Sequence, residues 1–185
     1  GGKRMLLSNQ QKYIISVLRQ IKYIRSCQLC ALTAQYYRPQ GIEISQHRMD
    51  VMLRQLRAGT NFVRLQEDIV CYGKRTVDPR YLEAIDVMLE LSGYAPAFFS
   101  SERLESPFLL RFTGSGKELS YLFTVAWMDT PERIHATSRM KGERIIWISD
   151  RRDSRGIALP RHHIFAVRQE DGTHRFFGSH EPEKI

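Results

Sequence analysis

Apolar residues recur every three or four positions in three segments of the first sixty residues, which predicts three amphipathic helices. The expected starts are Ser8 or Asn9, then Ser26, then Ser45, because each can cap a helix with its side chain. The expected inward positions are Ile14, Val17, Leu18, Ile21; Leu29, Cys30, Leu32, Ala34; and Met49, Met52, Leu53, Leu56. The second helix ends before Pro39, and the third ends at Gly59. The first two helices are expected to join by a sharp turn.

Two short apolar runs follow the third helix. Residues 62–65 and 69–72 are separated by a polar stretch, which predicts a β-hairpin. Three helices followed by a two-stranded ribbon form the order of a winged helix-turn-helix, a DNA-binding unit expected over residues 3–77. Asp78 can cap a linking helix over 78–93, with Tyr81, Ile85, Met88 and Leu89 facing inward.

The remainder changes to the pattern of strands, which predicts a small α+β domain over residues 105–180 and an α+β class for the whole chain. Strands are expected at 108–112, 119–127, 144–148, 163–168 and 175–177. A short helix is expected to open at Thr130-Pro131-Glu132.

Charge is distributed unevenly along the chain. The 185 residues carry a formal net charge of +8. Residues 1–77 hold thirteen Lys/Arg against four acids, a net charge of +9, and the rest holds fifteen against sixteen. A basic module joined to a neutral one favours a polyanion-binding domain, with a basic surface kept for solubility as the alternative. A hydrophobic fraction of 42% with 26% charged residues excludes wholesale disorder.

The third helix is the expected base-reading element. If Met49 marks its buried centre, then His47, Val51 and Arg54 lie nearly opposite. Arginine pairs with guanine, glutamine with adenine, and valine meets the thymine methyl. The expected DNA-binding residues are Ser45, Gln46, His47, Arg48, Val51, Arg54 and Gln55 on the helix and Arg64, Lys74 and Arg75 at the ribbon. An ordinary solvated helix face has the same pattern and stays open as an alternative.

Candidates for other chemistry are weak. Cys27 and Cys30 have zinc-knuckle spacing and could be completed by Cys71 and His47, but three buried structural thiols explain the pattern better, so neither metal nor cofactor is expected. The run from Gly114 to Lys117 lacks the spacing of a phosphate loop and fits a hairpin turn. Further along, His162 and His163 point to opposite faces of a strand and need no catalytic role, whereas Arg151, Arg152, Arg155 and Arg161 gather in a loop that could contact DNA or a partner.

Three segments, 14–18, 48–56 and 62–72, resemble proteins of the replication-relaxation type and related families of plasmids and integrative elements in Gram-positive bacteria. The resemblance implies a winged helix joined to a C-terminal domain similar to restriction endonucleases, and DNA binding at an origin or transfer region or in transcriptional control of the element. Such nucleases need an acid on one strand and Asp/Glu-x-Lys on the next. The expected hairpin over 108–127 supplies only Lys117 and Glu118, at its turn and in the wrong order, which indicates a degenerate domain.

The leading hypothesis is therefore a non-enzymatic, sequence-selective protein that binds double-stranded DNA, as a homodimer or with a protein partner held by the C-terminal domain. One alternative is a metal-dependent nuclease that uses acids such as Asp129, Glu132 and Asp150. Another is a winged helix that binds only protein. Three unpaired cysteines and the lack of an apolar leader or a long apolar run favour a cytoplasmic protein without membrane contact.

Overall fold

A computed structural model describes residues 5–114, 121–149 and 157–178. It confirms the α+β class and divides the chain into two compact units, Gly1–Leu82 and Glu83–Ile185. Within the described residues, every helix is too short or too polar to cross a membrane.

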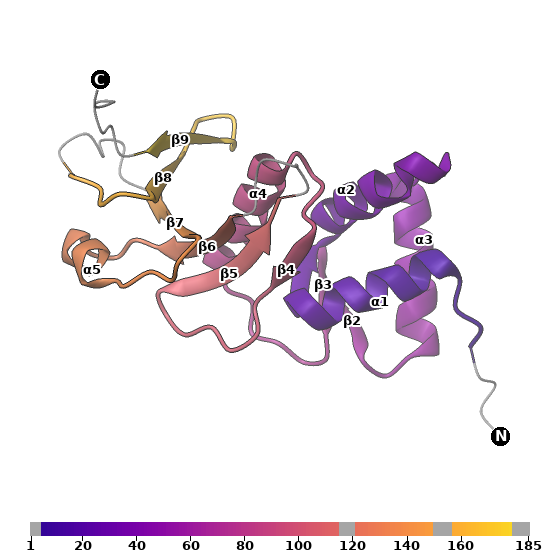
Figure 1. Cartoon of the computed structure of the whole chain (residues 1–185). Coiled ribbons are helices and arrows are strands. Elements are labelled where there is room, and N and C mark those ends of the chain that lie inside the picture. The colour runs from indigo at the N-terminus through magenta and orange to yellow at the C-terminus, as the bar shows by residue number, and fades with distance from the viewer. Residues whose placement is uncertain (1–4, 115–120, 150–156, 179–185) are drawn as a thin grey trace. The chain divides into compact units, whose positions relative to one another are not determined.

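The first unit contains three helices, a short 3-10 turn and a small sheet (Figure 1). Its elements are α1 (Asn9–Ile21), β1 (Tyr23–Arg25), α2 (Ser26–Tyr37), η1 (Arg38–Gln40), α3 (Gln46–Gly59), β2 (Val63–Gln66) and β3 (Ile69–Tyr72). The sheet has the order β1-β3-β2 and is antiparallel throughout. The first turn of α4 (Pro79–Ser92) also belongs to this unit.

The two helices with the clearest apolar period form as expected. Ser8 caps α1, where its Oγ accepts from Gln11 N at 3.1 Å and its own N donates to Gln11 Oε1 at 3.0 Å. Ser45 caps α3 by accepting from Arg48 N at 3.1 Å. All eight inward positions predicted for these two helices are buried.

The connection between α1 and α2 differs from the expected sharp turn. Residues 23–25 form β1, which pairs with β3 and places Ile24 opposite Val70, both fully buried. Lys22, just before it, has a positive φ of 78° and closes α1 by donating from its N to Leu18 O. Three residues are too few to show the alternation of a strand, so only the pairing with β3 reveals this element.

In α2 the expected cap and part of the expected interior were wrong. Ser26 is the first helical residue, and the N of Arg25 before it is satisfied by Gln28 Oε1 at 3.0 Å. Leu29 and Leu32 are buried, whereas Cys30 and Ala34 are only half-buried. The buried positions also include two polar residues, which are tolerated because they are hydrogen-bonded: Gln28 Nε2 donates to Leu82 O at 2.8 Å, and Thr33 Oγ1 donates to Leu29 O at 2.7 Å.

Helix α4 is buried on more than the one predicted face. Tyr81, Ile85, Met88 and Leu89 are buried as expected, and Leu82, Glu83, Ala84 and Val87 are buried as well. A helix that is buried around most of its circumference has no single apolar stripe. The apolar spacing of its sequence therefore predicts fewer buried positions than the structure has. Its start is tied to the first unit, because Asp78 N donates to Tyr23 Oη at 3.0 Å and the Tyr81 hydroxyl donates to Ile21 O.

The second unit is a six-stranded mixed sheet with the order β4-β5-β6-β7-β8-β9 (Figure 1). Its elements after α4 are β4 (Phe98–Ser100), β5 (Phe108–Thr113), β6 (Leu122–Trp127), α5 (Pro131–Ala136), β7 (Glu143–Ser149), β8 (His163–Arg168) and β9 (His174–Gly178). Strands β6, β7 and β8 run parallel to one another, and the other neighbours are antiparallel.

The sheet is covered on both faces. On one face, Ile134 of α5 packs into a cluster with Ala126, Trp147 and Phe165. Side chains alternate along a strand, so Arg168, three residues after Phe165, points to the other face, where α4 meets it. Burial of both faces explains why β7 reads as an almost continuous apolar run.

The predicted strands and the short helix of this unit are present, with ends shifted by one or two residues where they are described. Strand β4 was missed, since three residues next to Pro96 carry no alternating pattern. Of the turn predicted from Gly114 to Lys117, only Gly114 is among the described residues. Residues 119–120, Asp150 and the arginines at 151, 152 and 155 also lie outside them.

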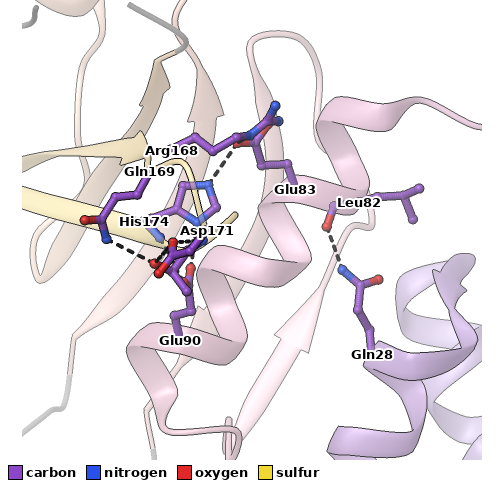
Figure 2. A network of polar contacts seen from close by, with 9 residues as sticks. Gln28, Leu82, Glu83, Glu90, Arg168, Gln169, Asp171 and His174 are labelled. Carbon is purple, nitrogen blue, oxygen red and sulfur yellow. Dashed lines mark hydrogen bonds and ion pairs between the residues drawn. The ribbon is translucent and has the colours of Figure 1, made fainter. Parts of the chain in front are cut away.

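A buried ion network fastens β8 and β9 to α4 (Figure 2). His174 lies between two carboxylates: its Nε2 is 2.9 Å from Glu83 Oε1 and its Nδ1 is 2.6 Å from Glu90 Oε2. Its backbone N also donates to Glu90 Oε1 at 2.9 Å. Arg168 forms two hydrogen bonds with Glu83, one of them from Nε at 2.9 Å, in the paired geometry that favours arginine.

The network favours the charged forms of His174 and Glu83. Burial opposes the imidazolium of His174, but hydrogen bonds to Glu83 and Glu90 outweigh it and raise the histidine pKa. Burial likewise opposes the carboxylate of Glu83, but hydrogen bonds from His174 and Arg168 lower its pKa. The imidazolium of His174 and the guanidinium of Arg168 therefore compensate the buried carboxylate of Glu83.

The raised pKa of His174 predicts a loss of stability on the alkaline side. A raised folded-state pKa contributes stability that is complete below the ordinary value of 6.5 and is lost as pH rises through the folded value. The denaturation midpoint should therefore decrease as pH rises from about 6.5 through the raised pKa of His174. Tryptophan fluorescence reports this unit alone, because Trp127 and Trp147 are the two tryptophans of the chain and both belong to it.

His174→Gln is the matched variant and should give a flat midpoint over this window. His163 does not interfere, since burial lowers its pKa and its contribution is lost only as pH falls below about 6.5. An equal decline in the wild type and in His174→Gln would contradict the assignment.

Candidate nucleic-acid interface

The outward face of α3 is open to solvent. Met49, Met52, Leu53 and Leu56 point into the unit and are at most 7% exposed. Six of the seven helix positions expected to contact DNA are exposed, namely Ser45, Gln46, His47, Arg48, Arg54 and Gln55, and Val51 is half-buried. The amphipathic arrangement inferred from Met49 is thus present, and it leaves a polar face of mixed donors and acceptors.

Several of these exposed side chains already have partners in the protein. Gln46 Nε2 donates to Asp50 Oδ1 at 2.9 Å, and Arg48 Nη1 donates to Glu43 O at 3.1 Å. Gln55 Oε1 accepts from the buried Gln11 at 2.9 Å, so its amide is held in one orientation. Pairing with a base would require Gln46 or Arg48 to exchange its present partner.

A hollow of about 660 Å³ lies beside the end of α3 and the β2–β3 ribbon. Four cationic side chains line it, and no acidic residue is among its described lining. These are Arg57 from the last turn of α3, Arg64 from β2, and Lys74 and Arg75 after β3. All four are exposed, which makes the hollow a site where anions can approach cations without a compensating carboxylate.

All four residues of β2 line the hollow, and Arg64 is the cation among them. Val63 is buried and Arg64 is exposed, because successive residues of β2 point to opposite faces. Gly73 leaves β3 with a positive φ of 71°, a conformation that favours glycine, and turns the chain toward Lys74. Arg75 is then oriented by a hydrogen bond from its Nε to Tyr72 O at 2.8 Å.

The structure brings together three predicted residues and adds others. Arg64, Lys74 and Arg75 line one hollow, as expected for side chains at the ribbon. Arg57 was not predicted, because the expected contacts on the helix were limited to the face opposite Met49 and did not reach its last turn. Its position three residues after Arg54 and just before the ribbon was the available signal. Thr60 and Asn61 also line the hollow. The Asn61 amide can donate hydrogen bonds there, whereas the Thr60 hydroxyl already donates to Leu56 O at 2.7 Å.

The expectation of three buried thiols was wrong for Cys27, which is exposed, whereas Cys30 is half-buried and Cys71 is buried. Burial raises the pKa of the Cys71 thiol, although nearby Arg75 acts in the opposite direction. Burial and Asp50 together raise the pKa of Cys30. Both side chains therefore remain thiols at neutral pH. Among the described residues, no group of three His, Cys, Asp or Glu side chains is placed to hold a metal ion.

The cap of α3 gives a testable prediction about the helix that carries this face. Ser45→Ala removes the acceptor for Arg48 N and should lower the free energy of unfolding by about 1 kcal/mol, measured by far-ultraviolet circular dichroism. Ser16→Ala is the matched control in the exposed middle of α1, where alanine favours the helix and should not destabilise. Equal losses in the two variants would contradict the capping role.

Comparison with known proteins adds no identification, since neither a family model nor a curated protein matches the chain.

Proposed function

We propose that this protein binds double-stranded DNA through α3 and the basic hollow beside it. The outward side chains of α3 meet base edges in the major groove, and the hollow holds the phosphates of the adjoining backbone. No chemical step is part of this function.

The arrangement of the first unit supports this proposal. Its elements follow the order helix, strand, helix, helix, strand, strand, and the sheet order is β1-β3-β2. Such an order is typical of a winged helix-turn-helix, in which the third helix reads the groove and the ribbon is the wing. The second unit has a helix, three antiparallel strands, a second helix, two strands parallel to β6 and a final antiparallel strand. This order is compatible with a restriction-endonuclease-like domain. Neither β5 nor β6 carries an acidic residue, whereas such a nuclease needs acids on neighbouring strands.

The observation that carries the proposal is the gathering of Arg57, Arg64, Lys74 and Arg75 around one hollow. Neutralised phosphates release counterions, and this release drives much of the affinity for DNA. The tip of the ribbon is acidic, with Glu67 and Asp68, so the side of the ribbon that carries Arg64 is the part that meets the backbone.

Within α3, His47 and Arg54 are the exposed side chains best suited to base contacts. Both stand on the face opposite Met49, and arginine can bind guanine through two hydrogen bonds. Val51 between them offers an apolar contact to a thymine methyl. This set of donors and one apolar group favours sequence-selective binding.

The wider role we propose is that of a transcriptional regulator, or of an accessory factor in replication or transfer of a mobile element, acting in the cytoplasm. The second unit would then mediate pairing of two copies or recruitment of a protein partner. Two copies would bind two half-sites related by symmetry.

Fluorescence polarisation against a labelled random-sequence duplex at a series of salt concentrations tests the proposal. Four phosphate contacts in the hollow predict a slope of log K against log salt of about −3.6 or steeper. Selection from a random duplex library should then enrich one sequence motif. A slope near zero, or no binding at low salt, would overturn the proposal.

A further inference from the structure

The parallel strands of the second unit gather basic residues at one edge of the sheet. Strands β6, β7 and β8 start at the same edge, because Leu122 pairs with Glu143 and Ile145 pairs with His163. The segments that enter these strands therefore meet there, although they are far apart in sequence. They carry Arg139, Lys141, Arg144, Arg161 and His162.

These residues line two adjoining hollows of about 390 Å³ each. One is lined by Arg139, Lys141 and Glu143, and the other by Arg144, Arg161 and Phe176. His162 lines both. It has a positive φ of 64°, a conformation that costs energy in a residue with a side chain and that clusters at functional sites.

The opposite edge of the same sheet carries acids and bases side by side. Asp129 and Glu132 follow β6, where Arg133 Nη1 is 3.2 Å from Asp129 Oδ2, and Glu170 and Asp171 follow β8, which ends at Arg168. The cations that line the two hollows lie at the edge where the parallel strands begin, so attraction of an anion is local to these hollows.

Two buried polar atoms at this edge have no hydrogen-bond partner. Glu143 is 4% exposed and lines one hollow, and its Oε2 is unpaired. Arg144 lines the other hollow, and its Nε is unpaired. A buried polar atom without a partner costs free energy, so unpaired atoms on side chains that line a hollow favour a ligand that supplies the partner.

The hollows also contain surfaces on which a base can stack. The guanidinium of Arg144 lies over the ring of Tyr121, with Cζ 4.0 Å from the ring centroid. Phe176 lines the second hollow. Aromatic rings and guanidinium planes both stack on nucleobases.

We propose that the starting edge of β6, β7 and β8 is a second nucleic-acid site, which holds single-stranded nucleic acid by its phosphates and by an unstacked base. The cations contact phosphates, Arg144 with Tyr121 or Phe176 stacks the base, and Glu143 accepts a hydrogen bond from a base N–H. Only a single strand can present such a base, because the bases of a duplex are stacked and paired. The inference does not depend on duplex binding by the first unit.

The test uses the full chain with Arg64→Ala and Lys74→Ala, which weaken the basic hollow of the first unit, and a fluorescein-labelled single-stranded DNA of mixed sequence. Adding Lys141→Gln and Arg161→Gln should weaken binding about tenfold and lower the salt slope by about 1.4, the share of two phosphate contacts on a single strand. Both side chains are exposed, so folding should not be affected.

Arg103→Gln with Arg175→Gln is the matched control. It removes the same charge from exposed residues away from the hollows and should leave affinity within about twofold, because salt screens distant charges. Equal weakening by the two pairs would show that only net charge matters and would overturn the inference. Loss of single-strand binding already in the background variant would also overturn it, as would equally tight binding of a duplex at this edge.

The variant Glu143→Leu distinguishes two roles for the Glu143 carboxylate, binding a ligand or stabilising the fold. Removal of a buried carboxylate whose Oε2 has no hydrogen-bond partner should raise the denaturation midpoint and at the same time weaken single-strand binding. A lower midpoint with unchanged binding would mean that the carboxylate serves the fold, against the inference. Absence of duplex binding by the wild-type chain would contradict the proposed function alone.

Discussion

Replacing Arg64, Lys74 and Arg75 together by alanine is expected to weaken duplex binding about a hundredfold or more at low salt. Each of these cations lines the hollow beside α3 and neutralises one phosphate. The slope of log K against log salt should fall by about 2.7, which is the contribution of three phosphate contacts on a duplex. Fluorescence polarisation across a salt series measures both quantities.

The matched control replaces Lys12, Arg19 and Arg38, which are exposed on α1 and η1 and do not line the hollow. It removes the same total charge from the same unit. If the effect is local, affinity changes little and the salt slope is preserved. The same loss in both triple variants would mean that net charge, and not the hollow, determines binding.

Trp147→Ala is expected to lower the free energy of unfolding of the second unit by about 3–5 kcal/mol. Trp147 is fully buried in the cluster that joins α5 to the sheet, and its Nε1 donates to His163 Nδ1 at 3.0 Å. The substitution removes a large apolar volume and leaves a buried acceptor without its donor. Denaturant titration followed by the fluorescence of Trp127 reports the change.

Trp147→Phe distinguishes the contribution of apolar packing from that of the hydrogen bond to His163. It keeps most of the apolar volume, so its smaller loss reflects mainly the hydrogen bond to His163. A loss below about 1 kcal/mol in Trp147→Ala would be typical of a surface position and would contradict the packing described.

The parts of the fold that follow from local pattern were predictable. The helices α1 and α3 have an apolar period, a serine cap and a clear end, so local signals agree with the tertiary structure. Strands β1 and β4 have three residues each and depend on their neighbours in the sheet. No window of the sequence contains that information.

The contacts that depend on distant pairing were not predictable. His174 meets Glu83 across 91 positions of sequence, and each residue alone resembles an ordinary surface charge. The basic edge of the second unit has the same origin, because parallel register, and not proximity in sequence, brings Lys141 and Arg161 to one edge. At the first unit, charge along the sequence indicated the right module, and only the fold placed Arg57 beside Arg64.

The most direct test of the central claim is nuclear magnetic resonance of the ¹⁵N-labelled chain titrated with a DNA duplex. If α3 and the basic hollow form the interface, amide shifts will concentrate in residues 45–57, 60–66 and 73–75. Shifts that concentrate in α1 or the second unit, with these three segments unchanged, would contradict the account.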